Sequence, residues 1–386
     1  MTTNQQLAQS YCLTNARIVT PETVLQGSVR IEGDRIAAVG PDVDPTRGDD
    51  IVDADGQYLL PGLIDLHGDD IEGQLQPRNG ARMDTAMALG AADRSNVAAG
   101  ITTKYHAIAF ENDPEEGRTT ELAAELTEAI EAADSWMADH RIHVRCEVTQ
   151  EEAVTAAIRD IQRDAVDLVS VMSHIPGKGQ FEDIAAFKKY YETSDRHTVA
   201  EAERFIEERT SISMVEIRDR IDRVVKAARD AGVVTASHDD EDPQEVERLS
   251  ERGVDIAEYP ITLETAKRAN ELGMTTVMGA PNLVRGESQW GNLTSIDAAD
   301  AGVLDVLCVD YHPPSLLAAP FVDTGEPLPK RVARVTKNPA DAVGLQDRGR
   351  IAEGARADLV VVDTEETPTV SRAFVAGRGV YKAEGS

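Results

Sequence analysis

The sequence predicts an α/β fold with a (β/α)8 barrel and a small β-sandwich formed by the N- and C-terminal segments. The length of 386 residues suits one large barrel plus a smaller unit. Strand-like and helical segments alternate through the middle of the chain, and both ends are rich in strands. We place the composite sandwich at residues 1–60 and 345–386 and the barrel at residues 61–344.

Both ends of the chain contain short strand-like runs separated by turns. Residues 11–60 alternate between apolar and polar positions, and EGDR (32–35) is expected to form a hairpin turn. GRIAEGARADLVVVD (349–363) and SRAFVAGRGVY (371–381) have the same pattern. Because these helix-poor ends flank a long middle, we expect the two termini to meet in one β-domain.

The middle of the chain alternates between apolar runs and acid-rich helical segments, which favours a parallel sheet with helical crossovers. A doubly wound open sheet is the competing architecture, but no GxGxxG motif follows the first strand. GAPNLVRGESQWGN (279–292) lacks a helical period and is expected to be an ordered loop. Strands are expected at 61–67, 101–109, 141–148, 166–173, 233–238, 255–261, 275–280 and 303–309. Helices are expected at 83–99, 119–139, 150–163, 181–230, 243–252, 264–271 and 295–301.

The composition indicates an acidic protein of a reducing cytoplasm. The formal net charge is −30, from 69 acids against 39 bases, which is typical of high-salt proteomes and unlike the basic footprint of a nucleic-acid binder. No apolar run reaches the length of about 18 residues that a membrane span needs, and we expect neither a span nor a signal peptide. Cys12, Cys146 and Cys308 are expected to be small buried residues. A homo-oligomer is compatible with this composition, as is a monomer.

Histidines and acids follow several of the expected strands. In a barrel enzyme, functional side chains come from the carboxyl ends of different strands. Each residue alone has an ordinary explanation, such as helix capping by Asp240 or Asp242 before Pro243. Together they supply the imidazole and carboxylate ligands that divalent ions prefer. These strand-end residues are His67, Asp69, Glu147, His174, His238, Asp239, Asp310 and His312.

Several motifs of this sequence are similar to those of a known superfamily. LPGLIDLH and, much later, VTKNPADAVGLQDRGRIAEGARADLVVVD (335–363) resemble the amidohydrolase superfamily. Within it, ASHDD, MGAPNLVRG and SHIPGKGQF resemble the PhnM family, the ribose 1-methylphosphonate 5-triphosphate diphosphatases of the C–P lyase phosphonate pathway. The resemblance implies a metal-dependent hydrolase that acts on a small phosphorylated substrate and does not bind nucleic acid or membranes.

The same resemblance implies a binuclear centre, with two divalent ions that are zinc or, alternatively, manganese. Glu147 would bridge the two ions, and Asp310 would also be catalytic, accepting the proton of the attacking water. The implied metal ligands are His67, Asp69, Glu147, His174, His238 and Asp310. The implied substrate-binding residues are Arg78, Lys178, Asn282, Arg285, His106 and Asp239.

The implied reaction is hydrolysis of the triphosphate to the 5-phosphate and pyrophosphate by a metal-bridged hydroxide. A C–N hydrolase, such as an N-acyl amino acid deacylase or a cyclic amidase, is the alternative, and a non-catalytic scaffold is a third hypothesis. The sequence departs from the family at HGDD, where HTDN is usual, at His106, near a usual aspartate, and at His312, where tyrosine is common. The role of Asp70 stays open, with helix or loop capping as the safer assignment.

One count departs from the superfamily pattern. The expected strands place His174 and His238 on the fourth and fifth strands, whereas the superfamily more often has them on the fifth and sixth. We therefore expect that one strand was missed or that two strands were merged, within 181–230.

Overall fold

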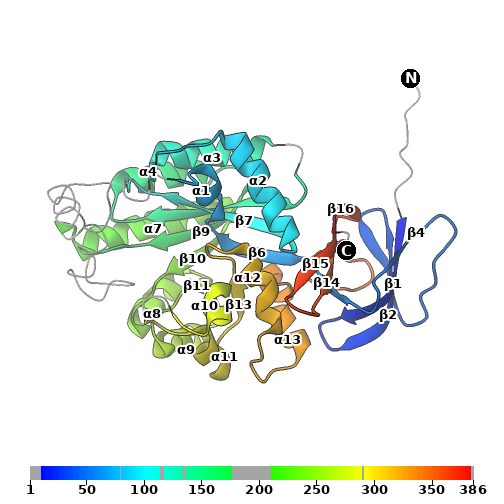
Figure 1. The fold of residues 1–386 in the computed structure, drawn as a ribbon. Helices are drawn as coiled ribbons and strands as arrows, with labels where there is room; N and C mark the ends of the chain where they lie inside the picture. Colours follow the sequence, from blue (N-terminus) through cyan, green and yellow to red (C-terminus); the bar gives the residue numbers. More distant parts are fainter. Residues whose placement is uncertain are drawn as a thin grey trace. The chain divides into compact units, whose positions relative to one another are not determined.

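The computed structural model describes residues 10–78, 80–113, 117–133, 136–175, 209, 211–288 and 291–383 (Figure 1). The predicted substrate-binding residue Lys178 lies outside these ranges. The chain divides into two compact units, each described by itself. Unit 1 comprises residues 1–104, 135–140 and 306–386, and unit 2 comprises residues 105–134 and 141–305.

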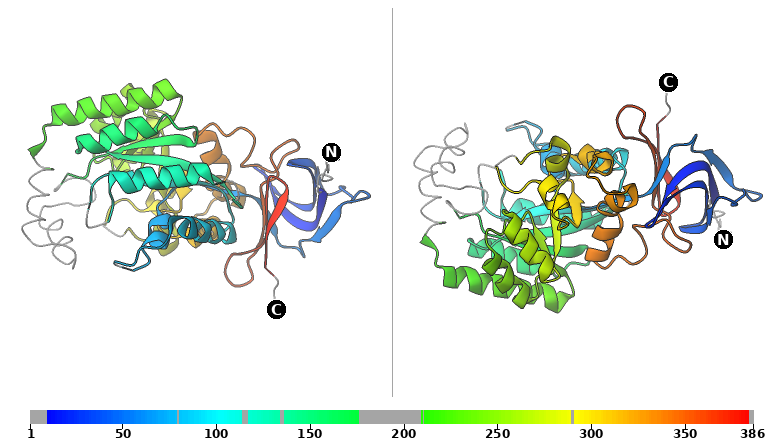
Figure 2. Two further views of the ribbon diagram at one scale, coloured as in Figure 1. Left: turned by 90° about the horizontal axis from the view of Figure 1, so that it is seen from above. Right: turned by 90° about the horizontal axis from the view of Figure 1, so that it is seen from below.

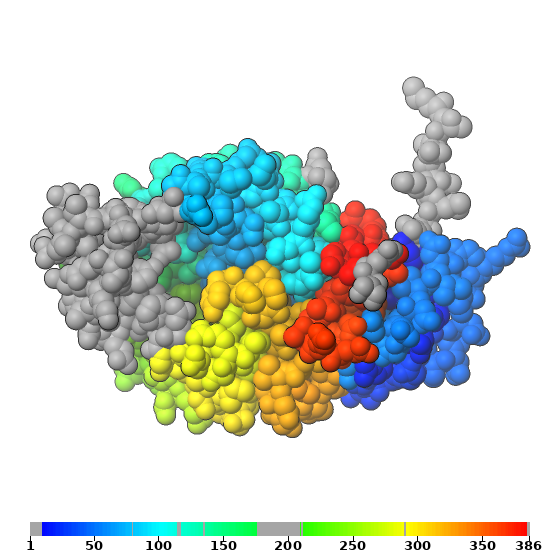
Figure 3. Space-filling view, in the orientation of Figure 1, coloured from blue at the N-terminus to red at the C-terminus, as the bar shows by residue number. Residues whose placement is uncertain are grey.

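The two ends of the chain form one sheet within unit 1. Its strands are β1 (Ser10–Val19), β2 (Val24–Glu32), β3 (Arg35–Gly40), β4 (Asp50–Asp53), β5 (Tyr58–Pro61), β14 (Leu359–Asp363), β15 (Thr369–Val375) and β16 (Arg378–Lys382). They follow the order β16-β15-β14-β5-β1-β2-β3, and β4 pairs with β1. Figure 2 shows the red C-terminal strands beside the blue N-terminal ones, and the red and blue surfaces adjoin in Figure 3. β14 pairs with β5 antiparallel.

The predicted meeting of the termini in one β-structure is therefore confirmed. The expected hairpin turn also forms, because Glu32 pairs with Arg35 and Gly33 has φ 59°, a conformation that glycine adopts without strain. Alternate residues of these strands, such as Leu13, Ile31 and Phe374, are buried in one apolar core. The predicted domain boundaries at residues 60 and 345 stay predictions.

The barrel sheet contains all eight expected strands. Its order is β13-β12-β11-β10-β9-β8-β7-β6, and the ladders from β8 to β12 are parallel. A parallel bridge between Gly68 and Asp310 joins the first strand to the segment after the last, which closes the ring. The strands are β6 (Leu63–Gly68), β7 (Ile101–Phe110), β8 (Asp139–Glu147), β9 (Val166–Met172), β10 (Val234–His238), β11 (Ile256–Glu258), β12 (Thr275–Gly279) and β13 (Val306–Cys308).

Most of the segment 181–230, where helices and a missed or merged strand were expected, lies outside the described residues, and the barrel sheet holds no additional strand at that point. β9 and β10 are hydrogen-bonded neighbours, with Leu168 opposite Val234, so no strand lies between them in the sheet. His174 therefore follows the fourth barrel strand, and His238 ends the fifth.

Helices follow most of the barrel strands, as the alternation predicted, and Figure 2 shows α3, α4 and α7 side by side in one layer. Clear stop and start signals bound them: Asp242 caps the helix that begins at Pro243, and Gly253 ends it with φ 87°. The helices of the barrel are α1 (Asp70–Leu75), α2 (Thr85–Ala98), α3 (Thr120–Ala132), α4 (Glu151–Asp160), α7 (Met214–Ala231), α8 (Pro243–Arg252), α9 (Leu263–Glu271), α10 (Ala280–Arg285), α11 (Ser295–Asp300), α12 (Pro313–Ala318), α13 (Leu328–Ala333) and α14 (Lys337–Ala342), with a short 3-10 helix η1 (Ala319–Phe321).

The expected loop at 279–292 is partly wrong, because its first residues form α10. Pro281 lies in the first turn and Gly286 ends the helix with φ 73°. A helix of six residues is too short to show a helical period in the sequence, although its proline and glycine mark both ends. Among the described helices, none is long and apolar enough to cross a membrane.

Candidate metal centre

Glu147 lies at the carboxyl end of β8 in unit 2 and is fully buried. One carboxylate oxygen, Oε1, accepts hydrogen bonds from the backbone N–H of Thr149 at 3.0 Å and from its hydroxyl at 2.6 Å. The other, Oε2, lies 2.9 Å from His174 Nδ1 and accepts from the His174 N–H at 3.1 Å. Burial alone would raise the pKa of Glu147, but Arg209 and His174 outweigh it and hold this pKa at about 2. The carboxylate is therefore ionised and ready to serve as a ligand.

A second buried acid, Glu111, lies beside this pair, directly after β7. Its Oε2 is 4.0 Å from His174 Nδ1 and 3.4 Å from Arg209 Nη2, and Arg118 approaches Oε1 at 3.0 Å. Burial alone would raise the pKa of Glu111, but Arg118, His174 and Arg209 outweigh this effect. The pKa of Glu111 is therefore lowered overall. Donor atoms of Glu111, Glu147 and His174 lie within 4.8 Å of one another, as a shared cation requires.

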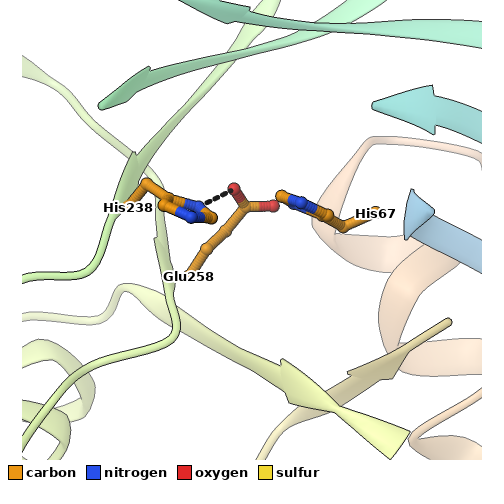
Figure 4. A group of neighbouring side chains, drawn as sticks. All are labelled: His67, His238 and Glu258. Atoms are coloured by element: carbon orange, nitrogen blue, oxygen red, sulfur yellow. Dashed lines mark hydrogen bonds and ion pairs between the residues drawn. The ribbon is translucent and has the colours of Figure 1, made fainter. Parts of the chain in front are cut away.

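His238 ends β10, and its neighbour across the ladder is Glu258, the last residue of β11. Figure 4 shows the hydrogen bond from His238 Nδ1 to Glu258 Oε2 (3.4 Å). Glu258 is fully buried, and His143 Nε2 lies 3.8 Å from it. A buried carboxylate between two imidazoles is a strong candidate for a ligand or a ligand partner.

Asp239 follows His238 in the left-handed region, with φ 57°, which turns its side chain away from the strand direction. Burial raises the pKa of Asp239 to about 6. Donor atoms of His174, His238 and Asp239 lie within 4.8 Å of one another. Unit 2 thus contains two overlapping groups of imidazole and carboxylate donors that share His174.

The remaining predicted ligands lie in unit 1, where the ends of β6 and β13 are joined through their backbones. The Asp310 N–H donates to His67 O at 2.8 Å, and the Asp69 N–H donates to Asp310 O at 3.0 Å. Asp310 has φ 58°, again in the left-handed region. His67 is 2% exposed. His67, Asp69 and Asp310 therefore come from one connected piece of backbone.

The donor set fits divalent metal ions of the zinc or manganese type. Zn²⁺ is bound by imidazole and carboxylate groups, and the residues that contribute them here stand at the carboxyl ends of barrel strands, where barrel enzymes place their sites. Glu111 and Glu147 are also buried, and positive neighbours lower the pKa of both carboxyl groups, which favours the ionised form that binds a metal ion.

The predicted substrate-binding residues have different surroundings. His106 lies within β7 and is fully buried. Arg78 is exposed, and Arg285 is exposed at the end of α10, where it pairs with Glu287 at 2.9 Å. Asn282 makes hydrogen bonds with backbone groups, donating to Leu293 O at 3.3 Å and accepting from Ser295 N–H at 2.9 Å.

Two residues left open by the sequence receive definite surroundings. Asp70 is the first residue of α1, but its carboxylate pairs with buried Lys104. His312 is exposed before α12, and its Nδ1 lies 2.8 Å from Ser315 Oγ. The helix cap expected near Pro243 is Asp242, whereas Asp240 is buried and accepts from the Ser237 hydroxyl at 2.5 Å.

Sequence reasoning missed Glu111, Glu258 and Arg209. Glu258 carries the same signal as Glu147, a lone carboxylate in an apolar strand, in IAEYPIT. Glu111 stands just past the expected end of its strand at residue 109. Arg209 has no local signal, since it is one arginine in a charged segment.

The chain is similar to known proteins over most of its length. The model of the Amidohydrolase family matches residues 145–376. The chain is 34% identical, over 362 residues, to the alpha-D-ribose 1-methylphosphonate 5-triphosphate diphosphatase of Escherichia coli (strain K12), an alignment that covers 92% of this chain and 95% of that protein. It is also 27% identical over 406 residues to a dihydroorotase of Halobacterium salinarum, covering 91% of this chain and 87% of that protein.

Among solved structures, a dihydropyrimidinase from Brevibacillus agri matches with a TM-score of 0.65 at 13% identity, covering 97% of this chain and 95% of that one. This likeness concerns the fold alone. The family match and the long alignment with the Escherichia coli protein show more: the chain belongs to the amidohydrolase family and is a hydrolase.

Proposed function

We propose that this protein hydrolyses alpha-D-ribose 1-methylphosphonate 5-triphosphate to the 5-phosphate and pyrophosphate in phosphonate catabolism. The observation that carries the proposal is the 34% identity with the Escherichia coli diphosphatase over 92% of the chain. The buried acids and histidines at the strand ends support it, because they supply ligands for the ions that such a reaction uses.

The proposed centre holds two divalent ions, zinc first and manganese as the alternative. His67, Asp69, Glu147, His174, His238 and Asp310 are the proposed ligands. Glu258 is added to them because it is fully buried and accepts a hydrogen bond from His238 (Figure 4). The ions would supply Lewis-acid charge and the activation of water.

The side chains of the chain itself would divide the remaining tasks. The Asp310 carboxylate accepts a proton from the attacking water, and Glu147 keeps its negative charge because Arg209 and His174 lower its pKa. Arg78, Arg285 and Lys178 are the proposed cations that bind the triphosphate. Because the protein has a net charge of −30, the negative charge of the triphosphate has to be neutralised by positive groups near it. His106, Asn282 and Asp239 are the other proposed substrate contacts.

The chemistry balances as a simple hydrolysis. Water adds across the phosphoanhydride bond between the first and second phosphates, one product keeps the ribose 5-phosphate, and pyrophosphate leaves. Performing the reaction in ¹⁸O-labelled water shows which phosphorus is attacked, since the label enters only the product that contains it.

A substrate panel tests the proposal. It contains a ribose 5-triphosphate analogue, nucleoside triphosphates, N-acyl amino acids and dihydroorotate, each with Zn²⁺ or Mn²⁺ at low and high salt. Pyrophosphate release from the ribose 5-triphosphate in preference to the other triphosphates supports the proposal. Turnover of an amide substrate without pyrophosphate release would refute it in favour of a C–N hydrolase, for which the dihydroorotase relative is the supporting observation.

The variant Glu147→Gln tests the proposed metal centre independently of the proposed substrate. The amide keeps the shape of the side chain but removes the charge that the ions need, so both metal content and turnover should fall together. Glu152→Gln, an exposed change on α4, is the matched control. Full metal content in Glu147→Gln would contradict the bridging role.

We also propose that the protein works in a reducing, salt-rich cytoplasm. Cys12, Cys146 and Cys308 are free thiols and all buried. The charge of −30 predicts that activity rises with KCl concentration, because salt screens the repulsion between surface acids. Activity that falls steadily from low to molar salt would contradict this assignment.

A further inference from the structure

A fully buried ammonium group links the residues on either side of Gly68. Lys104, on β7, is 0% exposed, and its Nζ lies 2.7 Å from Asp65 Oδ2 and also contacts Asp70 Oδ1. The other oxygen of Asp70 accepts from Asn96 Nδ2 at 2.8 Å. Buried charges are tolerated only when they are paired and hydrogen-bonded, so these three charged side chains depend on one another.

Asp65 extends this ion group to the backbone of two strand ends. Its Oδ1 accepts from the His67 N–H at 3.2 Å and from the Val309 N–H at 2.8 Å. His67 is itself a proposed ligand, and Val309 directly precedes the proposed ligand Asp310. One carboxylate thus orients both pieces of backbone, and Lys104 orients that carboxylate.

A side chain at position 68 would displace the buried Lys104 ammonium group from its present place. A Cβ atom on Gly68 would lie 1.9 Å from Lys104 Nζ and 2.5 Å from Asp65 Oδ2, far inside van der Waals contact. The threonine of the usual HTDN motif would therefore crowd the Lys104 ammonium group and the Asp65 carboxylate. Asp70, where that motif has asparagine, supplies the second carboxylate for the ammonium. Both departures from the motif are explained by the same lysine.

We propose that Lys104 is a positioning residue of the metal centre, holding Asp65 and Asp70 so that His67, Asp69 and Asp310 are presented in ligand geometry. This assignment rests on the metal centre of the proposed function. The alternative is an ion group that stabilises the fold and has no particular effect on the strand ends. The two hypotheses differ in whether disturbing Lys104 affects the strand ends and metal binding or only the overall stability. A set of matched glycine variants distinguishes them.

Three glycine-to-alanine variants share one chemical change. Gly68→Ala crowds Lys104, whereas Gly62→Ala crowds the opposite end of β6, where its Cβ would lie 2.1 Å from Thr102 Oγ1. Gly73→Ala, in α1, places its Cβ in open space. The readouts are the melting temperature, amide hydrogen exchange of the metal-free protein, and Zn²⁺ affinity by chelator competition.

Gly68→Ala and Gly62→Ala should both lower the melting temperature. Only Gly68→Ala should speed exchange at the His67 and Val309 amides, by at least about tenfold, and weaken Zn²⁺ binding by about 10- to 100-fold. Gly73→Ala should leave both quantities at wild-type values. Lys104→Met combined with Asp70→Asn, which removes one charge of each sign, should reproduce the Gly68→Ala pattern if that variant folds poorly.

Wild-type exchange and Zn²⁺ affinity in Gly68→Ala, or in the double variant, would overturn the assignment. Equal losses in Gly62→Ala would also overturn it, because the effect would then be general destabilisation of β6. A wild-type chain that binds no divalent ion would refute the metal centre as well. Metal binding in the wild type with unchanged binding in Gly68→Ala refutes the role of Lys104 alone.

Discussion

Replacing Glu326 with glutamine tests how much its pairing with Arg334 stabilises the segment beside β13 in unit 1. Glu326 binds Arg334 (Oε1 to Nη2, 3.0 Å), Lys330 (2.8 Å) and the Thr324 hydroxyl (2.9 Å). Arg334 is 2% exposed, and its backbone oxygen accepts from the Leu307 N–H of β13 at 2.9 Å. The ion pair between Glu326 and Arg334 therefore stabilises β13, the strand that leads to Asp310.

The magnitude follows from the carboxyl group. Burial raises the pKa of Glu326, but its three hydrogen-bond partners lower it from 4.5 to about 2. At about 1.4 kcal/mol per pH unit, the charged form contributes about 3 kcal/mol to the free energy of unfolding at neutral pH. Its side chain is 16% exposed, so solvent screening reduces this to about 2 kcal/mol. Because the pKa is lowered by folding, the contribution is fully present above pH 4.5 and is lost as the pH falls through 2.

Urea unfolding at pH 7 and pH 3 measures this contribution. Glu326→Gln should lower the free energy of unfolding by about 2 kcal/mol at pH 7, and by less than half of that at pH 3. Glu366→Gln, an exposed change between β14 and β15, should remain within about 0.5 kcal/mol of the wild type at both values. A stability difference that is equal at the two pH values would refute the electrostatic explanation.

Three further predictions concern the site and its scaffold. Glu258→Gln should lower Zn²⁺ affinity by at least about 100-fold, measured by metal analysis after gel filtration. Glu251→Gln, an exposed change, should leave the affinity unchanged. If both variants retain the same amount of Zn²⁺, Glu258 is not a ligand. Dialysis against a chelator should abolish hydrolysis, and added Zn²⁺ or Mn²⁺ should restore it; activity that survives complete metal removal would contradict the metal centre. Asp242→Ala should cost about 1 kcal/mol by removing the cap of α8, seen as a lower urea midpoint, without changing metal content.

The architecture could be predicted because its signals are local. Barrel strands are covered on both faces, so β6 to β13 appear in the sequence as short apolar runs, and the helices between them carry their own caps. The short helix α10 escaped prediction because six residues do not complete two turns. The candidate ligands were found in the same local way, as polar residues directly after apolar runs.

Contacts between strands could not be predicted from these local signals. Glu258 faces His238 because the register of β10 and β11 pairs these two residues, and a register is a property of two strands together. Arg209 comes near Glu147 from more than 60 residues away in the sequence, a distance over which no pattern indicates contact.

The sequence by itself determined the α/β barrel, the meeting of the termini and the strand-end acids and histidines. These features follow from the local order of apolar and polar residues, which can be read directly along the chain. Only the tertiary structure decided that Lys104 lies between Asp65 and Asp70, and hence why glycine stands at position 68. The physical reason is that a buried charge is stable only beside its partners, and the fold alone brings those partners together.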